Sequence, residues 1–474
     1  MIRKLWYNRR KRKTSGCEAA VTRNGVRLEE IMLYLKNGCM IDPASGTEGY
    51  RDILIKEDKI VRIAPQGALE TELFVNDGGD CGVRTAAEDI TEIDISDQYV
   101  APGLVDVHVH FREPGFTYKE DIHTGARAAA RGGFTSVVLM ANTSPAVDNP
   151  ETLAYVLNKG KETDIHIHTC ANVTKGLQGK ELTDMETLSK LGAAGFTDDG
   201  IPIMDEKLLR AALRQAAKCG KPVSLHEENP SLITNNGINA GRAAMHYGIG
   251  GSPREAEISM VERDLRIAME GEADLSIQHI STKEAVELVR QAKKKNRHIY
   301  AEATPHHFTL TQEAVIGQGA LAKVNPPLRE ETDRLAIIEG LRDGTIDMIA
   351  TDHAPHSAEE KARPLTEAPS GMIGLETSFS LGMRELVNKG YLSMAELIEK
   401  MSYAPAKLYH LDAGYLAEGG PADLVVFDSN KMWTVESFVS KAANSPFVGE
   451  NLPGVISYTI CGGRIVYRAL GRRP

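Results

Sequence analysis

The fold is decided by the stretch Tyr99-Val-Ala-Pro-Gly-Leu-Val105 and its continuation Asp106-Val-His-Val-His-Phe-Arg112. The first part is largely apolar, which predicts a buried strand. Because side chains alternate along a strand, His108 and His110 are expected to point the same way, with Arg112 next on that side. Two imidazoles side by side at a strand end can bind one divalent metal ion, but two histidines that only pack in the core give the same pattern. The ends of the later strands decide between these interpretations.

The composition excludes several classes of protein. The chain has 474 residues, so length alone suggests about three domains, although one α/β barrel can take up about 250 residues. A formal net charge of −10 argues against a nucleic-acid-binding protein. The sequence has no apolar run near the ~18 residues that a membrane span requires. Its six cysteines are scattered without a CxxC pair, which favours a reducing, cytoplasmic location over secretion.

The beginning of the chain differs from the rest. Residues 1–13 contain seven Lys and Arg and no acid, and they lack the apolar core of a signal peptide. Residues 1–30 are therefore predicted to be a basic, disordered extension, or the product of an upstream start codon.

Short strand patterns occur towards both ends of the chain. Strands are predicted at residues 32–38, 52–56 and 59–63, and again at residues 422–427, 455–460 and 464–467. A polar, Gly- and acid-rich stretch at residues 69–92 is expected to be a surface insert. Neither end is long enough to bury the core of a β-sandwich alone. We therefore predict that residues 31–100 and 412–474 pair into one composite β-sandwich.

The central region, residues 101–411, alternates strands with helices. Strands are predicted at residues 101–110, 134–140, 164–170, 195–197, 222–225, 274–277, 298–303 and 347–351. Helices are predicted between them at residues 120–131, 205–218, 255–270, 283–294 and 333–342. This alternation predicts an α/β fold with a parallel sheet, specifically a (β/α)8 barrel. An open doubly wound sheet is the alternative.

Polar side chains that can bind metal follow five of these strands. They are His108 and His110 after the first strand, Asp198 and Asp199 after the fourth, His226, Glu227 and Glu228 after the fifth, His279 after the sixth, and Asp352, His353 and His356 after the eighth. In a barrel these strand ends meet at one mouth, where catalytic residues lie. Four histidines and two aspartates suit two ions of zinc or a similar metal that share ligands. The sequence therefore predicts a metal site.

The motifs at these strand ends are similar to those of a known family. They are His108-Val-His-Phe-Arg-Glu-Pro-Gly115, Met140-Ala-Asn-Thr143, Phe196-Thr-Asp-Asp-Gly200, Leu225-His-Glu-Glu228, Gln278-His-Ile-Ser281, Lys323-Val-Asn-Pro-Pro-Leu-Arg329 and Ala350-Thr-Asp-His-Ala-Pro-His356. In this order and spacing the chain, from about Met32 to its C-terminus, resembles the bacterial type I dihydroorotases of the amidohydrolase superfamily.

The resemblance implies a role for each of these residues. One metal ion would be bound by His108, His110 and Asp352, a second by His226 and His279, and Asp199 would bridge the two. Asp199 is preferred to Asp198 because it fits the family spacing. Asp352 would also be the catalytic proton shuttle.

A second set of residues would bind the substrate. The resemblance assigns substrate contacts to His110, Arg112, Asn142, Asn325, His356, Ser370 and Gly371. Arg112 is suited to a bidentate pair with a substrate carboxylate. The segment from His356 to Gly371 is a candidate lid over the substrate.

The activity implied by the resemblance is the reversible cyclisation of N-carbamoyl-L-aspartate to (S)-dihydroorotate and water, in pyrimidine (UMP) biosynthesis. Two divalent metal ions are expected, with zinc as the expected metal. The resemblance also implies a homodimer and allows association with aspartate transcarbamoylase, with no nucleic-acid or membrane partner.

Three other classes of protein share parts of this pattern. A hydantoinase, dihydropyrimidinase or allantoinase would share the barrel, but such relatives usually place a carbamylated lysine after strand four. This chain has Asp198 and Asp199 there, and its nearest lysine, Lys190, precedes the strand. An inactive barrel that scaffolds aspartate transcarbamoylase would tend to lose metal ligands, and all six are present here. A nucleobase deaminase would use one metal ion and a glutamate.

The remaining histidines are expected to have other roles. His166 and His168 alternate within the third strand and are predicted to pack. His306 and His307 are not predicted to be ligands, although they can orient the site. His353 is expected to point to the opposite face from Asp352.

Overall fold

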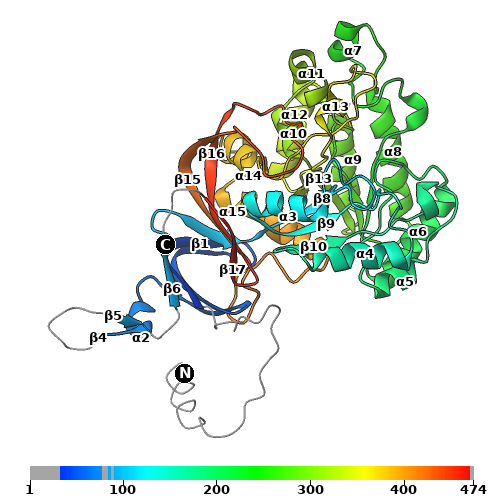
Figure 1. The fold of residues 1–474 in the computed structure, drawn as a ribbon. Coiled ribbons are helices and arrows are strands. Elements are labelled where there is room, and N and C mark those ends of the chain that lie inside the picture. Colours follow the sequence, from blue (N-terminus) through cyan, green and yellow to red (C-terminus); the bar gives the residue numbers. More distant parts are fainter. Residues whose placement is uncertain (1–31, 77–83, 87–89, 470–474) are drawn as a thin grey trace.

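The computed structural model describes residues 32–76, 84–86 and 90–469, so the predicted basic extension, residues 1–30, lies outside the described residues. A sheet built from both chain ends lies beside a barrel of parallel strands and helices (Figure 1).

The sheet beside the barrel is shared by the two ends of the chain. Its order is β17-β16-β15-β7-β1-β2-β3, and β6 also pairs with β1. The strands are β1 (Met32–Asp42), β2 (Thr47–Lys56), β3 (Lys59–Pro65), β6 (Ile90–Asp94), β7 (Tyr99–Pro102), β15 (Leu424–Thr434), β16 (Asn451–Cys461) and β17 (Arg464–Arg468). Strand β7 joins the two ends, because it pairs parallel with β1 and antiparallel with β15. Leu33, Ile55, Val426 and Ile460 share one buried cluster, so the sandwich core is composite as predicted.

The barrel closes through a complete circle of parallel contacts. Its strands are β8 (Leu104–Val109), β9 (Phe134–Leu139), β10 (His166–Thr169), β11 (Val223–Leu225), β12 (Leu275–Ile277), β13 (Ile299–Ala303) and β14 (Met348–Ile349). Phe196 occupies the fourth position and bridges Ala171 and Val223. His353 bridges back to Val109, with the His110 N–H donating to the His353 carbonyl at 2.9 Å. These contacts make the (β/α)8 barrel that the alternation of strands and helices predicts.

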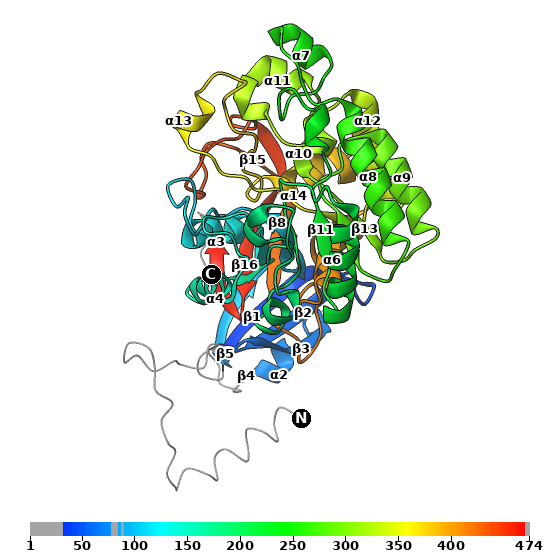
Figure 2. The ribbon, with the colours of Figure 1, turned by 90° about the vertical axis from the view of Figure 1, so that its right-hand side faces the viewer.

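Helices cover the outside of the barrel (Figure 2). The longer ones are α3 (Ile122–Arg131), α4 (Pro150–Gly160), α6 (Glu206–Cys219), α8 (Arg254–Ala268), α9 (Lys283–Lys293) and α12 (Glu331–Arg342). Short helical segments are α5 (Met185–Lys190), α7 (Arg242–Tyr247), α10 (Pro305–Thr309), α11 (Glu313–Gln318), α13 (Ala358–Lys361), α14 (Ser378–Gly382), α15 (Met394–Ile398), α16 (Ala404–Leu408), and the π-helical η4 (Met383–Val387) and η5 (Glu399–Tyr403). Several helices are capped at the N-terminus by a side chain that accepts a hydrogen bond from an N–H of the first turn. The capping residues of α3, α6 and α9 are Asp121, Asp205 and Thr282.

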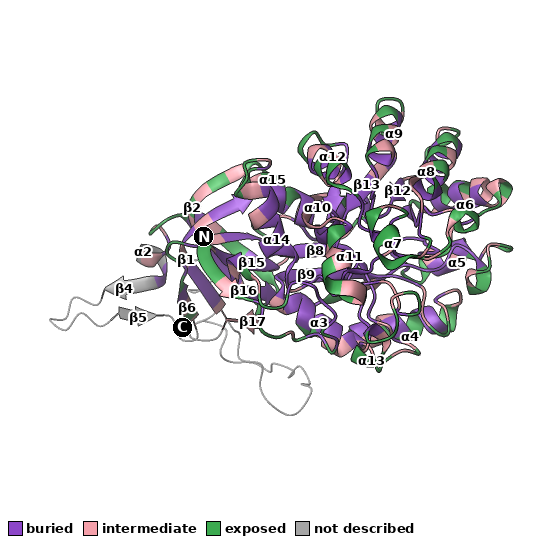
Figure 3. Ribbon diagram, turned by 90° about the horizontal axis from the view of Figure 1, so that it is seen from above, coloured by how far each residue is buried: buried purple, intermediate pink, exposed green. Residues whose placement is uncertain are grey.

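The burial pattern follows from this architecture. The barrel strands are mostly buried, whereas the helices are buried on the inner face and exposed on the outer face (Figure 3). Among the described residues, no helix combines the length and apolar character needed to span a membrane.

Two predictions about the strands were wrong. The apolar stretch at residues 99–105 is not one strand, because β7 belongs to the sandwich and β8 to the barrel. The break falls at Gly103, where an added Cβ would collide with the Thr135 side chain. The stretch at residues 69–92 is not entirely a surface insert. It contains α2 (Glu70–Leu73), β4 (Phe74–Asn76) and β5 (Arg84–Ala86), but its last residues begin β6, which pairs with β1 and buries Ile93.

Candidate metal centre

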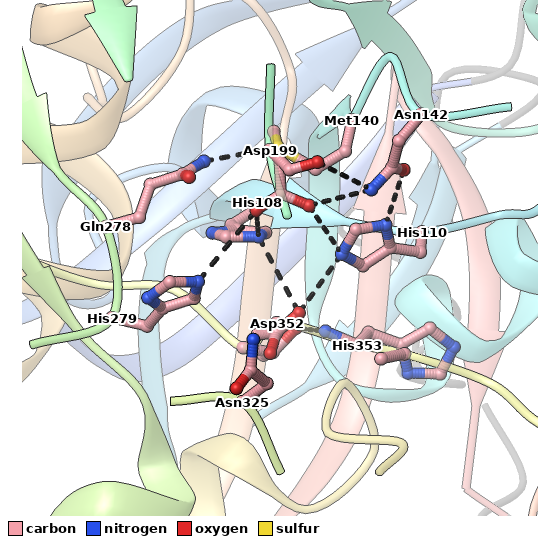
Figure 4. A network of polar contacts seen from close by, with 12 residues as sticks. His108, His110, Met140, Asn142, Asp199, Gln278, His279, Asn325, Asp352 and His353 are labelled. Atoms are coloured by element: carbon pink, nitrogen blue, oxygen red, sulfur yellow. Dashed lines mark hydrogen bonds and ion pairs between the residues drawn. The ribbon is translucent and has the colours of Figure 1, made fainter. Parts of the chain in front are cut away.

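Six predicted ligand residues meet at the carboxyl ends of the barrel strands. They are His108 and His110 at β8, Asp199 after Phe196, His226 after β11, His279 after β12 and Asp352 after β14. All six are buried, and the close view shows His108, His110, His279, Asp199 and Asp352 converging (Figure 4). Closure of the barrel therefore brings together side chains that are up to 244 positions apart in the chain, from His108 to Asp352.

The first ligand group is formed by His108, His110 and Asp199, with Asp352 beside them. His110 Nε2 lies 3.1 Å from Asp352 Oδ1 and 3.4 Å from Asp199 Oδ2. His108 Nε2 lies 3.5 Å from Asp199 Oδ1 and 3.6 Å from Asp352 Oδ1. Donors about 2.1 Å from a tetrahedral zinc ion stand about 3.4 Å apart. His110 Nε2 is hydrogen-bonded to Asp352 Oδ1, but His108 Nε2 has no hydrogen-bond partner among the described residues. The spacing of the group thus matches that of ligands around one ion.

The second ligand group is formed by Asp199, His226 and His279. His226 Nδ1 lies 3.1 Å from His279 Nε2, and His279 Nε2 lies 3.9 Å from Asp199 Oδ1. Asp199 therefore belongs to both groups, as expected for the predicted bridging carboxylate.

Neighbouring polar residues orient the ligands. Glu302, near the end of β13, lies 2.5 Å from His108 Nδ1 through Oε1. Asn142 Oδ1 accepts from His110 Nδ1 at 3.0 Å, and Asn142 Nδ2 donates to Asp199 Oδ2 at 2.9 Å. Such outer contacts fix the ring orientation of metal-binding histidines and raise their basicity.

Glu302 was missed by the sequence analysis. The signal was available, because Glu302 is an acid inside the otherwise largely apolar strand Ile299–Ala303 and is 1% exposed. A buried acid requires a partner, and here the partner is His108.

The electrostatics of the cluster favour a cation. Burial would raise the pKa of Asp199, but the facing histidines, His108 above all, hold the pKa of Asp199 well below its usual range. Burial opposes protonation of His108, yet Glu302 and Asp199 raise its pKa well above normal. Burial and then His226 lower the pKa of His279 well below normal. A metal ion that replaces the proton on His108 would satisfy the same carboxylates.

Three site residues adopt backbone conformations with positive φ. The values are 60° for Arg112, 30° for His279 and 46° for Asp352. Such conformations are unfavourable for side chains with a Cβ and tend to occur at functional sites. Packing around the mouth therefore holds these residues in place at a cost to the backbone.

The two adjacent aspartates have separate environments. Asp198 Oδ1 accepts from the backbone N–H of Val173 at 2.9 Å, and both of its carboxylate oxygens accept from the N–H of Thr174 at 3.1 Å. The side chain of Asp199 instead faces the histidines. Asp198 thus ties the loop after strand four to the preceding loop, and of the two aspartates it is Asp199 that belongs to the ligand groups among the described residues.

Arg112 lies beside the metal ligands, although strand alternation does not place it there. Strand β8 ends at Val109, and the positive φ of Arg112 turns its side chain towards the loop after β14. Its Nε donates to the Pro355 carbonyl at 3.2 Å, and its Nη2 lies 3.4 Å from His356 Nε2. Lys119 Nζ lies 3.4 Å from His356 Nδ1. Burial, Arg112 and Lys119 lower the pKa of His356 to about 2, so this side of the mouth combines two cations with a neutral imidazole.

Of the predicted ring contacts, Asn325 lies beside the second ligand group, whereas Ser370 and Gly371 lie next to His356. Asn325 Nδ2 lies 3.2 Å from His226 Nε2. The Ser370 carbonyl lies 2.9 Å from His356 Nε2, and the Gly371 N–H donates to the Lys323 carbonyl at 2.8 Å. A Cβ at Gly371, where φ is 129°, would come within 2.7 Å of Ala354 Cβ. The Gly371 N–H is thus engaged within the protein, and its contact with a substrate ring stays a prediction.

Two buried lysines, also missed by the sequence analysis, hold the segment before Gly371. Lys361 Nζ donates to the carbonyls of Pro369 at 2.9 Å and Gly371 at 2.8 Å. Lys323 Nζ donates to the carbonyls of Leu365 and Ala368 at 2.8 and 2.7 Å. Lys361 therefore holds the candidate lid together internally, and Lys323 ties the lid to the rest of the barrel domain.

The remaining histidines lie outside the ligand groups at the mouth. The prediction that His166 packs was wrong, because its side chain is 46% exposed and pairs with Asp423. His307 Nε2 lies 3.0 Å from the Pro326 carbonyl, next to Asn325. The ring of His353 turns away from the ligands, and its Nδ1 accepts from the Gly374 N–H at 3.1 Å.

Comparison with known proteins agrees with this architecture. A dihydropyrimidinase from Brevibacillus agri has a TM-score of 0.78 at 24% identity, covering 92% of this chain and 95% of that one. An L-hydantoinase from Arthrobacter aurescens has a TM-score of 0.78 at 25% identity, covering 93% and 96%. At this level of identity the likeness is one of fold.

The similarity to dihydroorotases is much closer. The dihydroorotase of Clostridioides difficile is 53% identical over 438 residues, covering 92% of this chain and 100% of the relative. The dihydroorotase of Lactococcus lactis is 50% identical over 440 residues, covering 93% and 100%. Residues 99–466 match the amidohydrolase family. The chain therefore belongs to the amidohydrolase family, and within that family it groups with the dihydroorotases.

Proposed function

We propose that this protein is a dihydroorotase that interconverts N-carbamoyl-L-aspartate and (S)-dihydroorotate at the barrel mouth. The observation that carries the proposal is that an aspartate, Asp199, is shared by both ligand groups. The hydantoinase alternative would need a lysine there. Lys190, the nearest candidate in sequence, is instead on the exposed face of helix α5, where its Nζ lies 2.5 Å from Glu186 Oε1.

Two divalent ions fit the residues present. One would be held by His108, His110 and Asp352, and the other by His226 and His279, with Asp199 between them. The fit rests on the donor spacing of 3.1–3.6 Å in the first group and on the unpartnered His108 Nε2 among the described residues. Nitrogen and carboxylate donors suit zinc. When bound, such ions polarise a carbonyl and lower the pKa of water from about 16 towards about 7.

Asp352 is the proposed proton shuttle. Its Oδ1 faces both His110 and His108, which leaves Oδ2 to take or return a proton. In ring closure the ureido nitrogen attacks the side-chain carboxylate of the substrate and loses a proton, and water departs. Joining a carboxylate to an N–H group consumes one proton overall, so acid favours closure and alkali favours hydrolysis.

Arg112 and His356 are proposed to hold the substrate carboxylate. The guanidinium provides a planar pair of donors, and the charge of Lys119 is close by. Because substrate and product are both anions, this cationic side of the mouth attracts them although the chain has a net charge of −10. Asn142 is engaged by His110 and Asp199, so it is proposed to contact substrate only while it also orients these ligands.

The decisive test is dihydroorotate hydrolysis at alkaline pH by the full-length protein, with samples stripped by chelator and then given zinc. Hydantoin, dihydrouracil and allantoin serve as competing substrates. We expect zinc-restored turnover confined to dihydroorotate. Turnover of a neutral ring instead would favour the hydantoinase alternative, and no turnover of any of the four would favour the scaffold alternative.

Assembly is proposed from family resemblance only. A homodimer is expected, and association with aspartate transcarbamoylase would be tested by light scattering of the two purified proteins, alone and mixed. Masses equal to the separate species after mixing would contradict the association.

A further inference from the structure

A second cluster of potential ligands lies where the barrel meets the sandwich. It consists of His166, the first residue of β10, Asp423, which precedes β15, and Cys461, the last residue of β16. Their ligand atoms all lie within 4.8 Å of one another. The cluster is built by the barrel and the C-terminal strands together, and it is separate from the two groups at the mouth.

The contacts within the cluster are directed. His166 Nε2 lies 2.9 Å from Asp423 Oδ2. Asp423 Oδ1 accepts from the Gly462 N–H at 2.8 Å, which fixes the carboxylate. The Cys461 thiol donates to the Thr135 carbonyl at 3.6 Å. Asp423 and Cys461 are 3% and 2% exposed, whereas the His166 side chain is 46% exposed, so solvent reaches the cluster from the His166 side.

The chemistry of this donor set is that of a zinc-type site. One thiolate, one imidazole and one carboxylate are all zinc ligands, and a fourth position towards solvent would complete a tetrahedron with water. Thiolate selects against magnesium and calcium. Burial and then the Asp423 carboxylate raise the pKa of the Cys461 thiol. A bound cation reverses both effects, because it stabilises the thiolate and neutralises the carboxylate.

We propose that His166, Asp423 and Cys461 bind one further divalent ion of the zinc class. Binding converts the Cys461 thiol to a thiolate and releases its proton to solvent. The ion replaces the hydrogen bond between His166 and Asp423 with two coordinate bonds, and it cross-links β10 of the barrel to β15 and β16 of the sandwich. The site takes no part in the proposed reaction at the mouth.

Cobalt(II) titration of the full-length protein tests the proposal independently of activity. Thiolate bound to cobalt gives a charge-transfer band in the near ultraviolet, whereas the ligand groups at the mouth contain no cysteine. After chelator treatment we expect this band to appear with a stoichiometry of one ion per chain. It should be lost in Cys461→Ser and retained in the control Cys219→Ser, whose thiol is also free.

Two further measurements keep the test decisive if Cys461→Ser folds poorly. His166→Gln changes a half-exposed side chain, and we expect it to reduce the bound zinc from three to two ions per chain and to weaken the cobalt band. Zinc should also raise the unfolding temperature of the wild type more than that of His166→Gln. Absence of the band in the wild type, or its persistence in Cys461→Ser, would overturn the proposal.

Discussion

Both ends of the barrel carry acidic side chains and histidines. At the amino ends of the strands these side chains form separate pairs, whereas at the carboxyl ends they form one buried cluster. At the amino ends of the strands, His298 Nδ1 pairs with Asp274 at 2.8 Å and Lys293 pairs with Asp347 at 2.6 Å. These pairs are partly exposed, and each acid has a cationic or imidazole partner beside it. At the carboxyl ends, Asp199 is faced by several imidazoles, all of them buried.

The difference distinguishes ion pairs that stabilise the barrel from a cluster that is suited to bind a cation. A simple pair satisfies its own hydrogen bonds and needs no ligand. At the crowded end, His108 Nε2 and His279 Nδ1 have no hydrogen-bond partner among the described residues. Arg112, His279 and Asp352 have positive φ there, and the pKa values of His108 and His279 are shifted in opposite directions. Such an arrangement costs free energy unless a cation completes it.

The largest effect is expected for Asp199→Asn. An amide is a poor substitute for a bridging carboxylate, so we expect metal content to fall below one ion per chain and turnover of dihydroorotate to fall on the order of 10³-fold. Elemental analysis and steady-state rates measure the two effects. The matched control is Asp198→Asn, one residue away, which should lower the unfolding temperature but retain both ions. If Asp199→Asn binds two ions and has a normal rate, Asp199 is not a metal ligand.

A smaller effect is expected for Glu302→Gln, which weakens the contact behind His108. Outer partners of metal-bound histidines typically contribute 10- to 100-fold in affinity, and we expect about that loss in a chelator competition assay. Asp347→Asn is the control, because Asp347 lies near the same strands at the opposite end and binds Lys293 and the Ala301 N–H. It should lower stability and leave metal affinity unchanged. Equal metal affinities for Glu302→Gln and wild type would contradict the orienting role.

The sequence was sufficient to predict those site residues that lie at the ends of barrel strands. His108, His110, His226, His279 and Asp352 follow predicted strands, and barrel closure requires them to meet. Strand periodicity also gave the composite sandwich, because each half exposes an apolar face that only the other half can cover.

Other features depend on tertiary contacts that periodicity does not encode. The break at Gly103 comes from close approach of Thr135, and the place of Arg112 comes from a left-handed turn. The lysines that hold the segment before Gly371 are buried by that segment itself, so nothing in their local sequence marks them as interior. His166 was assigned to packing because its partner, Asp423, lies 257 positions away.

The buried Lys361 gives a pH-dependent prediction. Burial, with Lys323 nearby, lowers the pKa of Lys361 from its usual 10.5 to about 7. Between these values the unfolded chain binds a proton that the folded chain does not, so stability rises with pH. We expect the free energy of unfolding of wild type, relative to Lys361→Met, to increase between pH 7 and pH 10 by roughly 1.4 kcal/mol per pH unit at most.

Chemical denaturation at several pH values measures this slope. The control is Lys389→Met, because the Lys389 side chain is 48% exposed and pairs with Glu385 on the surface. Its difference from wild type should stay nearly constant over the same range. If the difference in free energy of unfolding between wild type and Lys361→Met does not change with pH, Lys361 stays charged in the folded protein.

The smallest effect is expected for His166→Gln in metal-free buffer. The hydrogen bond to Asp423 raises the pKa of His166, so the stabilisation is present below the unfolded pKa of about 6.5 and is lost as pH rises through the folded value. Because the side chain is 46% exposed, solvent screening keeps the effect below about 1 kcal/mol. The destabilisation should therefore be larger at pH 5.5 than at pH 9 in denaturant titrations with chelator.

Zinc is expected to reverse this trend in the wild type, so that His166 contributes more to stability at pH 9 than at pH 5.5. That result would show that His166 and Asp423 bind the ion, and that a proton takes its place when the ion is removed. If the trend is the same with and without zinc, His166 and Asp423 belong with the simple pairs at the amino ends of the strands.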